Sequence, residues 1–208
     1  MDNEMQKIYR PRRLTSEEIR EGCINLANGD EEERRICVIN EEFRQGFDFI
    51  KTYDKSVSFF GSARTKEGDH HYEQARNIAG RIARELDYAV VTGGGPGIMA
   101  AANHGAKESG GRSIGFTITL PSEQTSNIHL TDEIRFYYFF TRKVALAYSA
   151  EAYIYLPGGY GTLDELFEIL TLIQTGKISP VPVILVGEDY WKPLDAFIRQ
   201  TLLEKHQT

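Results

Sequence analysis

Residues 152–170 read AYIYLPGGYGTLDELFEIL, in which an apolar run leads through three glycines into a segment with apolar residues at helical spacing. Ala152–Leu156 is apolar at every position, which is typical of a strand covered on both faces. Glycine is unfavourable in ordinary segments unless the backbone needs a positive φ or something must approach it closely. We therefore expect a strand-to-helix turn built around a ligand at Pro157–Thr162.

The alternation of apolar runs with amphipathic segments continues along most of the chain. Four further runs are strand-like: Val57–Phe60, Ala89–Thr92, Ile114–Ile118 and Val183–Val186. Amphipathic helices are indicated at Tyr72–Leu86 and Leu163–Ile173. This order predicts an α/β fold over residues 53–208: a doubly wound, mostly parallel, Rossmann-like sheet with helices on both faces.

Residues 1–52 are expected to form a helical N-terminal extension. Thr15 and Glu18 have the spacing of a capping box. Apolar residues then recur at helical spacing: Ile36, Ile39, Phe43, Phe47 and Ile50. The pattern predicts two helices between residues 15 and 52. Covering the sheet and padding a dimer interface are both open as their role.

The composition fits one ordinary globular domain, with 208 residues of which 41% are hydrophobic and 26% charged. A formal net charge of −6 argues against nucleic acid as a partner, because binding to phosphodiester backbones needs an excess of Lys and Arg. Cys23 and Cys37 lack metal-ligand spacing, and we expect two inert thiols in a reducing compartment. Because no apolar segment has signal-peptide or membrane-spanning length, the expected location is the cytoplasm, with no membrane partner.

Small residues follow three of the predicted strands. They are Gly61-Ser62-Ala63-Arg64, Gly93–Gly97 and Pro157–Thr162. The carboxyl ends of parallel strands meet at one edge of the sheet, and two of these loops lead into helices whose free N–H groups would face the same crevice. One such loop could simply make a tight turn. Two in one sheet favour an anion site, and the anion we expect there is phosphate.

A dinucleotide site is the first alternative, since Gly95–Ala100 satisfies G-x-G-x-x-A. The strand that follows should end in an acid that holds the ribose, yet the first acid after it is Glu123. A nucleoside triphosphate loop of the form G-x-x-x-x-G-K-[S/T] is also missing from the sequence. The pattern favours a mononucleotide, and we expect no cofactor and no metal. Pyridoxal phosphate is not expected, because Lys143 is paired with Arg142 and the other lysines lie among polar residues.

Two charged residues are candidates for chemistry. Glu165 is expected in the first turn of the helix after the second glycine loop, where the helix dipole favours the ionised carboxylate. Arg142 follows the aromatic run Tyr137–Phe140, which is typical of a buried helix face but would also suit a homodimer interface. His104 and His129 could donate protons, but single histidines are more often structural and nothing in the sequence pairs them.

Three motifs together resemble the LOG family of cytokinin riboside 5′-monophosphate phosphoribohydrolases over about residues 55–200. They are Gly93-Gly94-Gly95-Pro96-Gly97-Ile98-Met99, Arg142-Lys143 and Pro157-Gly158-Gly159-Tyr160-Gly161-Thr162-Leu163-Asp164-Glu165. The resemblance implies that Glu165 and Arg142 are the catalytic pair. The candidate substrate-binding residues are Gly61, Ser62, Gly94, Gly95, Gly97, Met99, Glu123, Lys143, Gly158, Gly159, Tyr160, Gly161, Thr162 and Thr171.

The resemblance implies hydrolysis of the N-glycosidic bond of a purine nucleoside 5′-monophosphate, giving free base and ribose 5-phosphate. Plant-like members have Met-His-x-Arg-Lys where this chain has Phe139-Phe140-Thr141-Arg142-Lys143, a form that resembles a longer bacterial branch and leaves the base specificity open. A homodimer or a multiple of it is expected. The alternative is a carrier of nucleotide or cofactor that uses the glycine loops without turnover. Such a carrier would have no use for Glu165 and Arg142.

Overall fold

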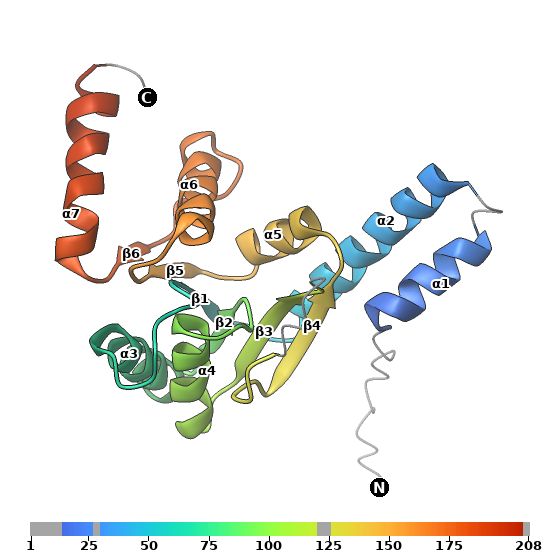
Figure 1. Ribbon diagram of the computed structural model, residues 1–208, viewed down its shortest axis with the longest axis horizontal. Coiled ribbons are helices and arrows are strands. Elements are labelled where there is room, and N and C mark those ends of the chain that lie inside the picture. Colours follow the sequence, from blue (N-terminus) through green and yellow to red (C-terminus); the bar gives the residue numbers. More distant parts are fainter. Residues whose placement is uncertain (1–13, 27–29, 120–125, 206–208) are drawn as a thin grey trace, which may run out of the picture.

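The computed structural model describes residues 14–26, 30–119 and 126–205, and its centre is a parallel sheet (Figure 1). The six strands are β1 Ser56–Phe60, β2 Ala89–Thr92, β3 Ser113–Ile118, β4 Asp132–Phe136, β5 Ala152–Tyr155 and β6 Val183–Leu185. Their order is β4-β3-β2-β1-β5-β6, and every neighbouring pair is parallel. The chain therefore builds outward from β1 to β4 and then returns to the other side of β1. The crevice at this reversal is where open α/β sheets bind ligands.

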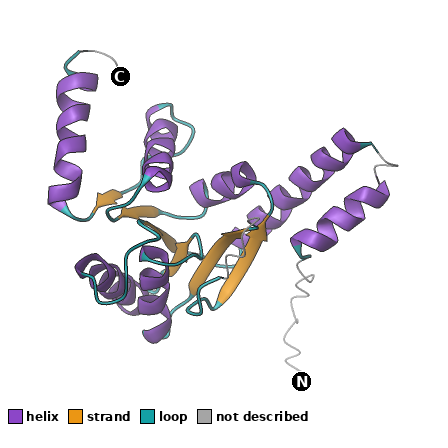
Figure 2. Ribbon diagram, in the orientation of Figure 1, coloured by secondary structure: helices purple, strands orange, loops and turns teal. Residues whose placement is uncertain are grey.

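Helices cover both faces of the sheet (Figure 2). One face carries α3 His70–Leu86 and α4 Ile98–Glu108, and the other carries α5 Phe139–Ala147 and α6 Tyr160–Gln174. Adjacent residues of β1 point to opposite cores, since Phe59 packs with α3 and α4 whereas Phe60 packs with Leu166 of α6. The prediction of a doubly wound α/β fold is confirmed.

The strand β4 at the edge of the sheet was not predicted from the sequence. In this strand only Ile134 and Phe136 are buried, and charged residues alternate with them. A half-buried edge strand gives a period-two pattern instead of the continuous apolar run of an interior strand. After β6, the chain ends in α7 Glu188–Phe197 and a π-helical segment, Ile198–Leu203.

The N-terminal extension forms the two expected helices, α1 Ser16–Leu26 and α2 Glu31–Ile50. The capping box is present: the Glu18 N–H donates to Thr15 Oγ1 at 3.2 Å, and the Thr15 N–H donates to Glu18 Oε2 at 2.7 Å. The expected apolar face of α2 is only partly correct, because Ile36 and Phe47 are exposed while Glu42 is buried. The buried face instead follows the contact of α2 with α5 and β4.

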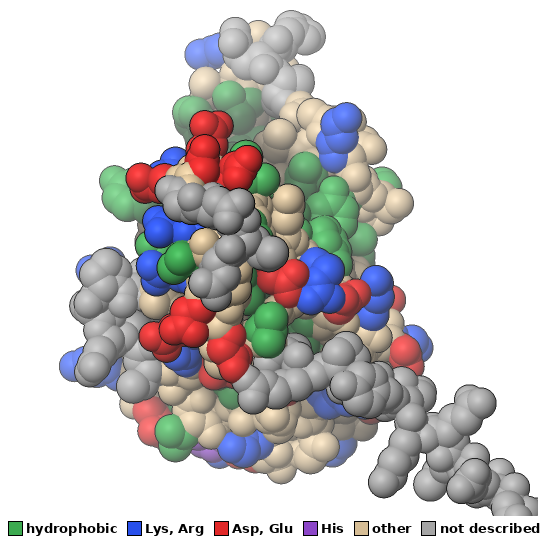
Figure 3. Space-filling model, turned by 90° about the vertical axis from the view of Figure 1, so that its right-hand side faces the viewer, with side chains coloured by type: hydrophobic (Ala, Val, Ile, Leu, Met, Phe, Trp, Pro, Cys, Tyr) green, Lys and Arg blue, Asp and Glu red, His purple; other side chains and the backbone are tan. Residues whose placement is uncertain are grey.

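The side of the molecule formed by α1 and α2 mixes acidic, basic and hydrophobic side chains (Figure 3). The hydrophobic ones include Leu14, Ile24 and Ile36, each more than 40% exposed. In the part of the chain that the structure describes, no helix has both the length and the apolar character needed to cross a membrane.

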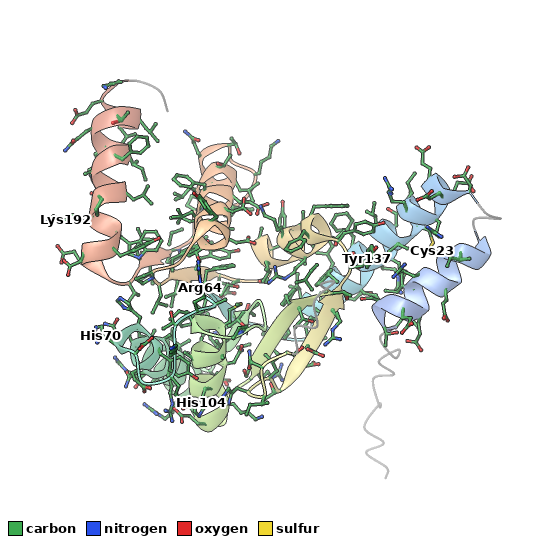
Figure 4. All side chains as sticks on the ribbon, in the orientation of Figure 1. Cys23, Arg64, His70, His104, Tyr137 and Lys192 are labelled. Atoms are coloured by element: carbon green, nitrogen blue, oxygen red, sulfur yellow. A yellow bond between two sulfur atoms is a disulfide. The ribbon has the colours of Figure 1, made fainter. Side chains whose placement is uncertain are left out.

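Cys23 and Cys37 are joined in a disulfide, which corrects the expectation of two inert thiols (Figure 4). The two residues are 14 positions apart, and the sequence by itself places them on separate helices. The hairpin of α1 and α2 brings their Cα atoms to 5.7 Å, which is within the range that a disulfide spans. Only the packing of the two helices reveals the pair.

Candidate active site

A cavity of about 350 Å³ lies at the carboxyl ends of β1 and β5, where the strand order reverses. Four segments line it: the loop after β1, the start of the β2–α4 connection, the first turns of α5, and the second glycine loop with α6. Its lining residues are Phe60, Gly61, Ser62, Ala63, Arg64, Gly93, Met99, Phe139, Arg142, Lys143, Gly159, Tyr160, Gly161, Thr162, Asp164 and Glu165. The fold thus gathers residues that are up to about a hundred positions apart.

The second glycine loop supplies the start of α6. Gly159 is the N-cap, and its carbonyl accepts from the N–H groups of Thr162 and Leu163 at 3.0 and 3.2 Å. Among the described residues, the N–H groups of Tyr160 and Gly161 have no backbone acceptor. These free N–H groups and the positive end of the helix dipole provide an anion-binding position in the cavity wall. Gly158 lies behind the wall, where a Cβ would overlap Thr162 Oγ1.

The first glycine loop contributes less to this cavity than expected. Gly97 caps α4 with a φ of 69°, and a Cβ there would overlap the carbonyl oxygen of Ser62. That carbonyl also accepts the Ile98 N–H at 3.0 Å, so the loop after β1 occupies part of the helix start. Gly97 therefore serves close packing between the two loops. From this region only Gly93 and Met99 line the main cavity.

Glu165 is 8% exposed and lies in the second turn of α6, because the helix already begins at Tyr160. Burial raises the pKa of this carboxyl from its ordinary value of 4.5 to about 7, against the opposing pull of the Arg142 charge. The expectation that the helix dipole keeps Glu165 ionised is wrong. The dipole acts mainly within the first turn, and burial dominates in the second.

Arg142 lies across the cavity from the second glycine loop. Its Nε donates to the Phe116 carbonyl at 2.6 Å, which fixes the side chain over the end of β3. The guanidinium passes so close to Gly93 that a Cβ there would overlap Nη2. Burial lowers the pKa of Arg142, and the charge of Glu165 opposes that shift. The cavity therefore combines a buried acid with a partly buried cation.

Lys143 lines the cavity but is held by the acids of α6. Its Nζ is 2.8 Å from Asp164 Oδ2 and 3.3 Å from Glu168 Oε2. Burial alone would lower the pKa of Lys143, but these carboxylates outweigh it and raise the pKa. A lysine that forms a Schiff base needs a lowered pKa, so this side chain is unsuited to hold pyridoxal phosphate.

A second cavity of about 240 Å³ adjoins the first and shares Ala63, Gly93, Met99, Phe139 and Arg142 with it. Its other lining residues are Gly94, Gly95, Thr117, Ile118 and Ser126. The wall is largely apolar around Met99, Ile118 and Phe139. This position is suited to a flat, weakly polar group such as a heterocyclic base.

Four candidates from the sequence are not placed in either cavity, and two of them, Gly97 and Gly158, pack against Ser62 and Thr162 instead. Thr171 lies farther along α6 and donates its hydroxyl to the Phe167 carbonyl at 2.6 Å. Glu123 lies outside the described residues. Conversely, Arg64 and Phe139 line the main cavity but were not among the candidates. Arg64 ends the small-residue loop that begins at Gly61 and Ser62, and this position is a signal that could have identified it.

The aromatic run before Arg142 is not a buried helix face. Tyr137, Phe139 and Phe140 are each exposed, and Phe139 is 56% exposed at the cavity mouth. The two histidines considered as proton donors do not line the cavity and stack on each other instead, with ring centroids 4.1 Å apart. Within the described ranges, no group of three or more His, Cys, Asp and Glu side chains is arranged to hold a metal ion.

Residues 99–208 match the protein family described as "possible lysine decarboxylase". The chain is 30% identical over 160 residues to the cytokinin riboside 5′-monophosphate phosphoribohydrolase of Rhodococcoides fascians. The aligned region covers 72% of this chain and 77% of the relative. It is 34% identical over 151 residues to the enzyme of the same name, LOG, from Oryza sativa subsp. japonica, with coverage of 70% and 60%. The solved structure of the molybdenum cofactor carrier protein MCP from Chlamydomonas reinhardtii has a TM-score of 0.52 and 27% identity, over 69% of this chain and 86% of that one.

Proposed function

We propose that this chain, which belongs to the LOG family of cytokinin riboside 5′-monophosphate phosphoribohydrolases, hydrolyses the N-glycosidic bond of a purine nucleoside 5′-monophosphate. The observation that carries the proposal is that Glu165, which is buried, and Arg142 line the same cavity. The glycine-rich start of α6 lines this cavity too. A decarboxylase activity is not proposed, because Lys143 is ion-paired and its pKa is raised.

The reaction breaks the bond between C1′ of the ribose and a ring nitrogen of the base. A water oxygen then bonds to C1′, one water proton is lost to a base, and the leaving purine gains a proton. Positive charge develops on the ribose in the transition state, and a fixed carboxylate beneath the sugar stabilises it. Glu165 supplies that carboxylate and accepts the proton of the attacking water, a role for which a pKa near 7 is well matched.

The substrate is oriented by the two ends of the cavity. We assign the 5′-phosphate to the start of α6, where the N–H groups of Tyr160 and Gly161 are free and Arg64 lies at the rim. The base extends toward the second cavity, against Met99 and Phe139. Arg142 lies between the two cavities, and its planar fork suits the ribose hydroxyls.

A homodimer is the proposed assembly. Phe139 and Phe140 are exposed beside the cavity, and Ile36 and Phe47 are exposed on α2. A chain of this size seldom leaves so many large apolar side chains in water unless they meet a partner. Light scattering should give twice the chain mass, and a monomer at micromolar concentration would refute the assembly. The proposed location remains the cytoplasm, although the Cys23–Cys37 disulfide is more typical of an oxidising compartment.

A carrier that binds without turnover is the competing function, since the MCP structure shares the fold. Incubation with AMP, adenosine and N6-isopentenyl-AMP, followed by chromatography for free base, separates the two. The phosphate contacts are remote from the reacting bond and help to position the ribose, so adenosine should lose kcat as well as apparent affinity. We expect release of adenine and ribose 5-phosphate from AMP. Equal cleavage of adenosine would refute the phosphate position, and binding of a monophosphate without cleavage would establish the carrier. The N6-substituted nucleotide decides the base specificity.

A further inference from the structure

Glu42 is an unusual residue to bury in the N-terminal extension. It is 2% exposed, whereas Ile36 on the same helix is 51% exposed and Phe47 is 38% exposed. A buried carboxyl is strongly unfavourable unless hydrogen-bond donors surround it. The orientation of α2 therefore depends on what the Glu42 side chain contacts.

The contacts of Glu42 all lie at the start of α5. Its Oε1 accepts the Tyr137 N–H, and its Oε2 accepts the Tyr138 N–H at 3.3 Å and the Thr141 hydroxyl at 2.7 Å. Tyr138 is the N-cap residue of α5, and its own side chain makes no capping hydrogen bond. A carboxyl from α2, nearly a hundred residues earlier, thus caps this helix and complements its dipole.

The capped turn of α5 leads directly into the active site. Arg142 follows Thr141, and its backbone N–H donates to the Tyr138 carbonyl at 3.3 Å. The Arg142 side chain donates from Nε to the Phe116 carbonyl. The residue is therefore held at its backbone by Tyr138 and at its guanidinium by β3. A shift of the first turn would move this guanidinium relative to Glu165.

We propose that Glu42 is a positioning residue that fixes the first turn of α5 and thereby holds Arg142 opposite Glu165. This inference rests on the proposed function, and it gives the N-terminal extension a role in catalysis. Glu42 acts through Thr141 and the backbone of α5, since its hydrogen bonds end there.

The titration of Glu165 reports on this geometry. The charged and titratable groups around the carboxyl come from three elements: Arg142 and Lys143 on α5, Asp164 and Glu168 on α6, and Tyr155 on β5. The two cations lower its pKa and the two acids raise it. A displaced α5 would weaken the pull of the cations, so the pKa would rise further. The loss of a negative charge at position 42 would by itself lower the pKa of Glu165. The direction of the pKa change therefore separates a displaced α5 from this direct charge effect.

Glu42→Gln is the test, and Glu41→Gln is its matched control on the neighbouring, partly exposed position of α2. Gln keeps one acceptor but places an NH₂ group against the donors of α5. Adenine release from AMP is measured between pH 5.5 and 9 on protein whose folding is checked by thermal unfolding. For Glu42→Gln we expect kcat to fall by about tenfold or more and the half-maximal pH to rise by about 0.5. Glu41→Gln should match the wild type.

Thr141→Val and Thr141→Ser provide a second pair if Glu42→Gln does not fold. Val removes one donor to Glu42 and should reproduce the rise in half-maximal pH, whereas Ser keeps the hydroxyl and should restore it. An unchanged or lowered half-maximal pH in folded Glu42→Gln would overturn the positioning role. Inactive wild-type protein would instead refute the proposed function. In that case ¹³C NMR titration of the Glu165 carboxyl, identified by its loss in Glu165→Gln, still decides whether Glu42→Gln moves its pKa.

Discussion

Replacement of Glu165 by Gln should greatly lower activity while making the protein more stable above neutral pH. The pKa of this carboxyl is raised from 4.5 to about 7, so the folded state favours the neutral form. The wild type therefore loses stability as the pH rises from about 4.5 through 7. Gln resembles the neutral carboxyl in shape and charge, and it does not incur that loss.

The magnitude follows from the two pKa values. A rise from 4.5 to about 7 corresponds to roughly 3 kcal/mol at pH 8, where the wild-type side chain is ionised in both states. At pH 5 the difference between the two proteins shrinks to about 1 kcal/mol or less, because this pH is close to the ordinary pKa of 4.5 and the unfolded wild type is then partly protonated as well. Turnover should fall by about a hundredfold or more, since the negative charge beneath the ribosyl cation is gone.

Denaturant unfolding at pH 5 and pH 8, together with adenine release from AMP, checks both parts. Glu73→Gln on α3 is the control, because its side chain is half-exposed and a surface change of this kind alters stability by only about 0.5 kcal/mol. Near-normal turnover of Glu165→Gln would refute the catalytic role. A variant that is less stable than the wild type at pH 8 would refute the claim that burial raises the pKa.

Three further outcomes are expected. The kcat/KM of the wild type for AMP should rise about tenfold between pH 6 and pH 8 as Glu165 ionises, and a flat profile over this range would contradict its role as the base. Arg142→Lys should lose most activity while remaining folded, because an ammonium cannot reproduce the guanidinium fork; normal kinetics would make Arg142 a bystander. Reductant should lower the unfolding temperature of the wild type, since opening a loop of 14 residues costs about 3 kcal/mol, but should leave a Cys23→Ser, Cys37→Ser double variant unchanged. Equal responses of the two proteins would show that the disulfide is not formed in solution.

Much of the fold could be predicted because its interior strands are marked locally. Each of them is a short, largely apolar run, and three of the four are followed by glycines. The edge strand β4 was missed because water covers much of it and its apolar residues alternate with charges. The buried face of α2 was predicted only in part for a similar reason. Ile36 and Phe47 of its apolar stripe are exposed, and the carboxyl of Glu42 is buried instead.

The candidate site was only partly predictable for a related reason. The glycine loops and the Arg142-Lys143 pair are contiguous in the sequence, so their motifs could be recognised there. Arg64 enters the cavity wall from the loop after β1 and Phe139 from the start of α5, and neither residue type by itself indicates a role in binding. Their contribution depends on the strand order, which brings the ends of β1, β3 and β5 to one edge.

The sequence by itself determined the α/β class, a glycine-rich strand-to-helix turn beginning at Pro157 and the choice of Glu165 and Arg142 as candidates, because these depend on local periodicity and on residue types in fixed spacing. Only the tertiary structure decided that Glu165 has a higher pKa than an ordinary glutamate and that Glu42 caps the helix carrying Arg142. Both facts depend on how much water reaches a carboxyl and on which donors surround it. Those quantities are set by segments far apart in the chain, and no local pattern contains them.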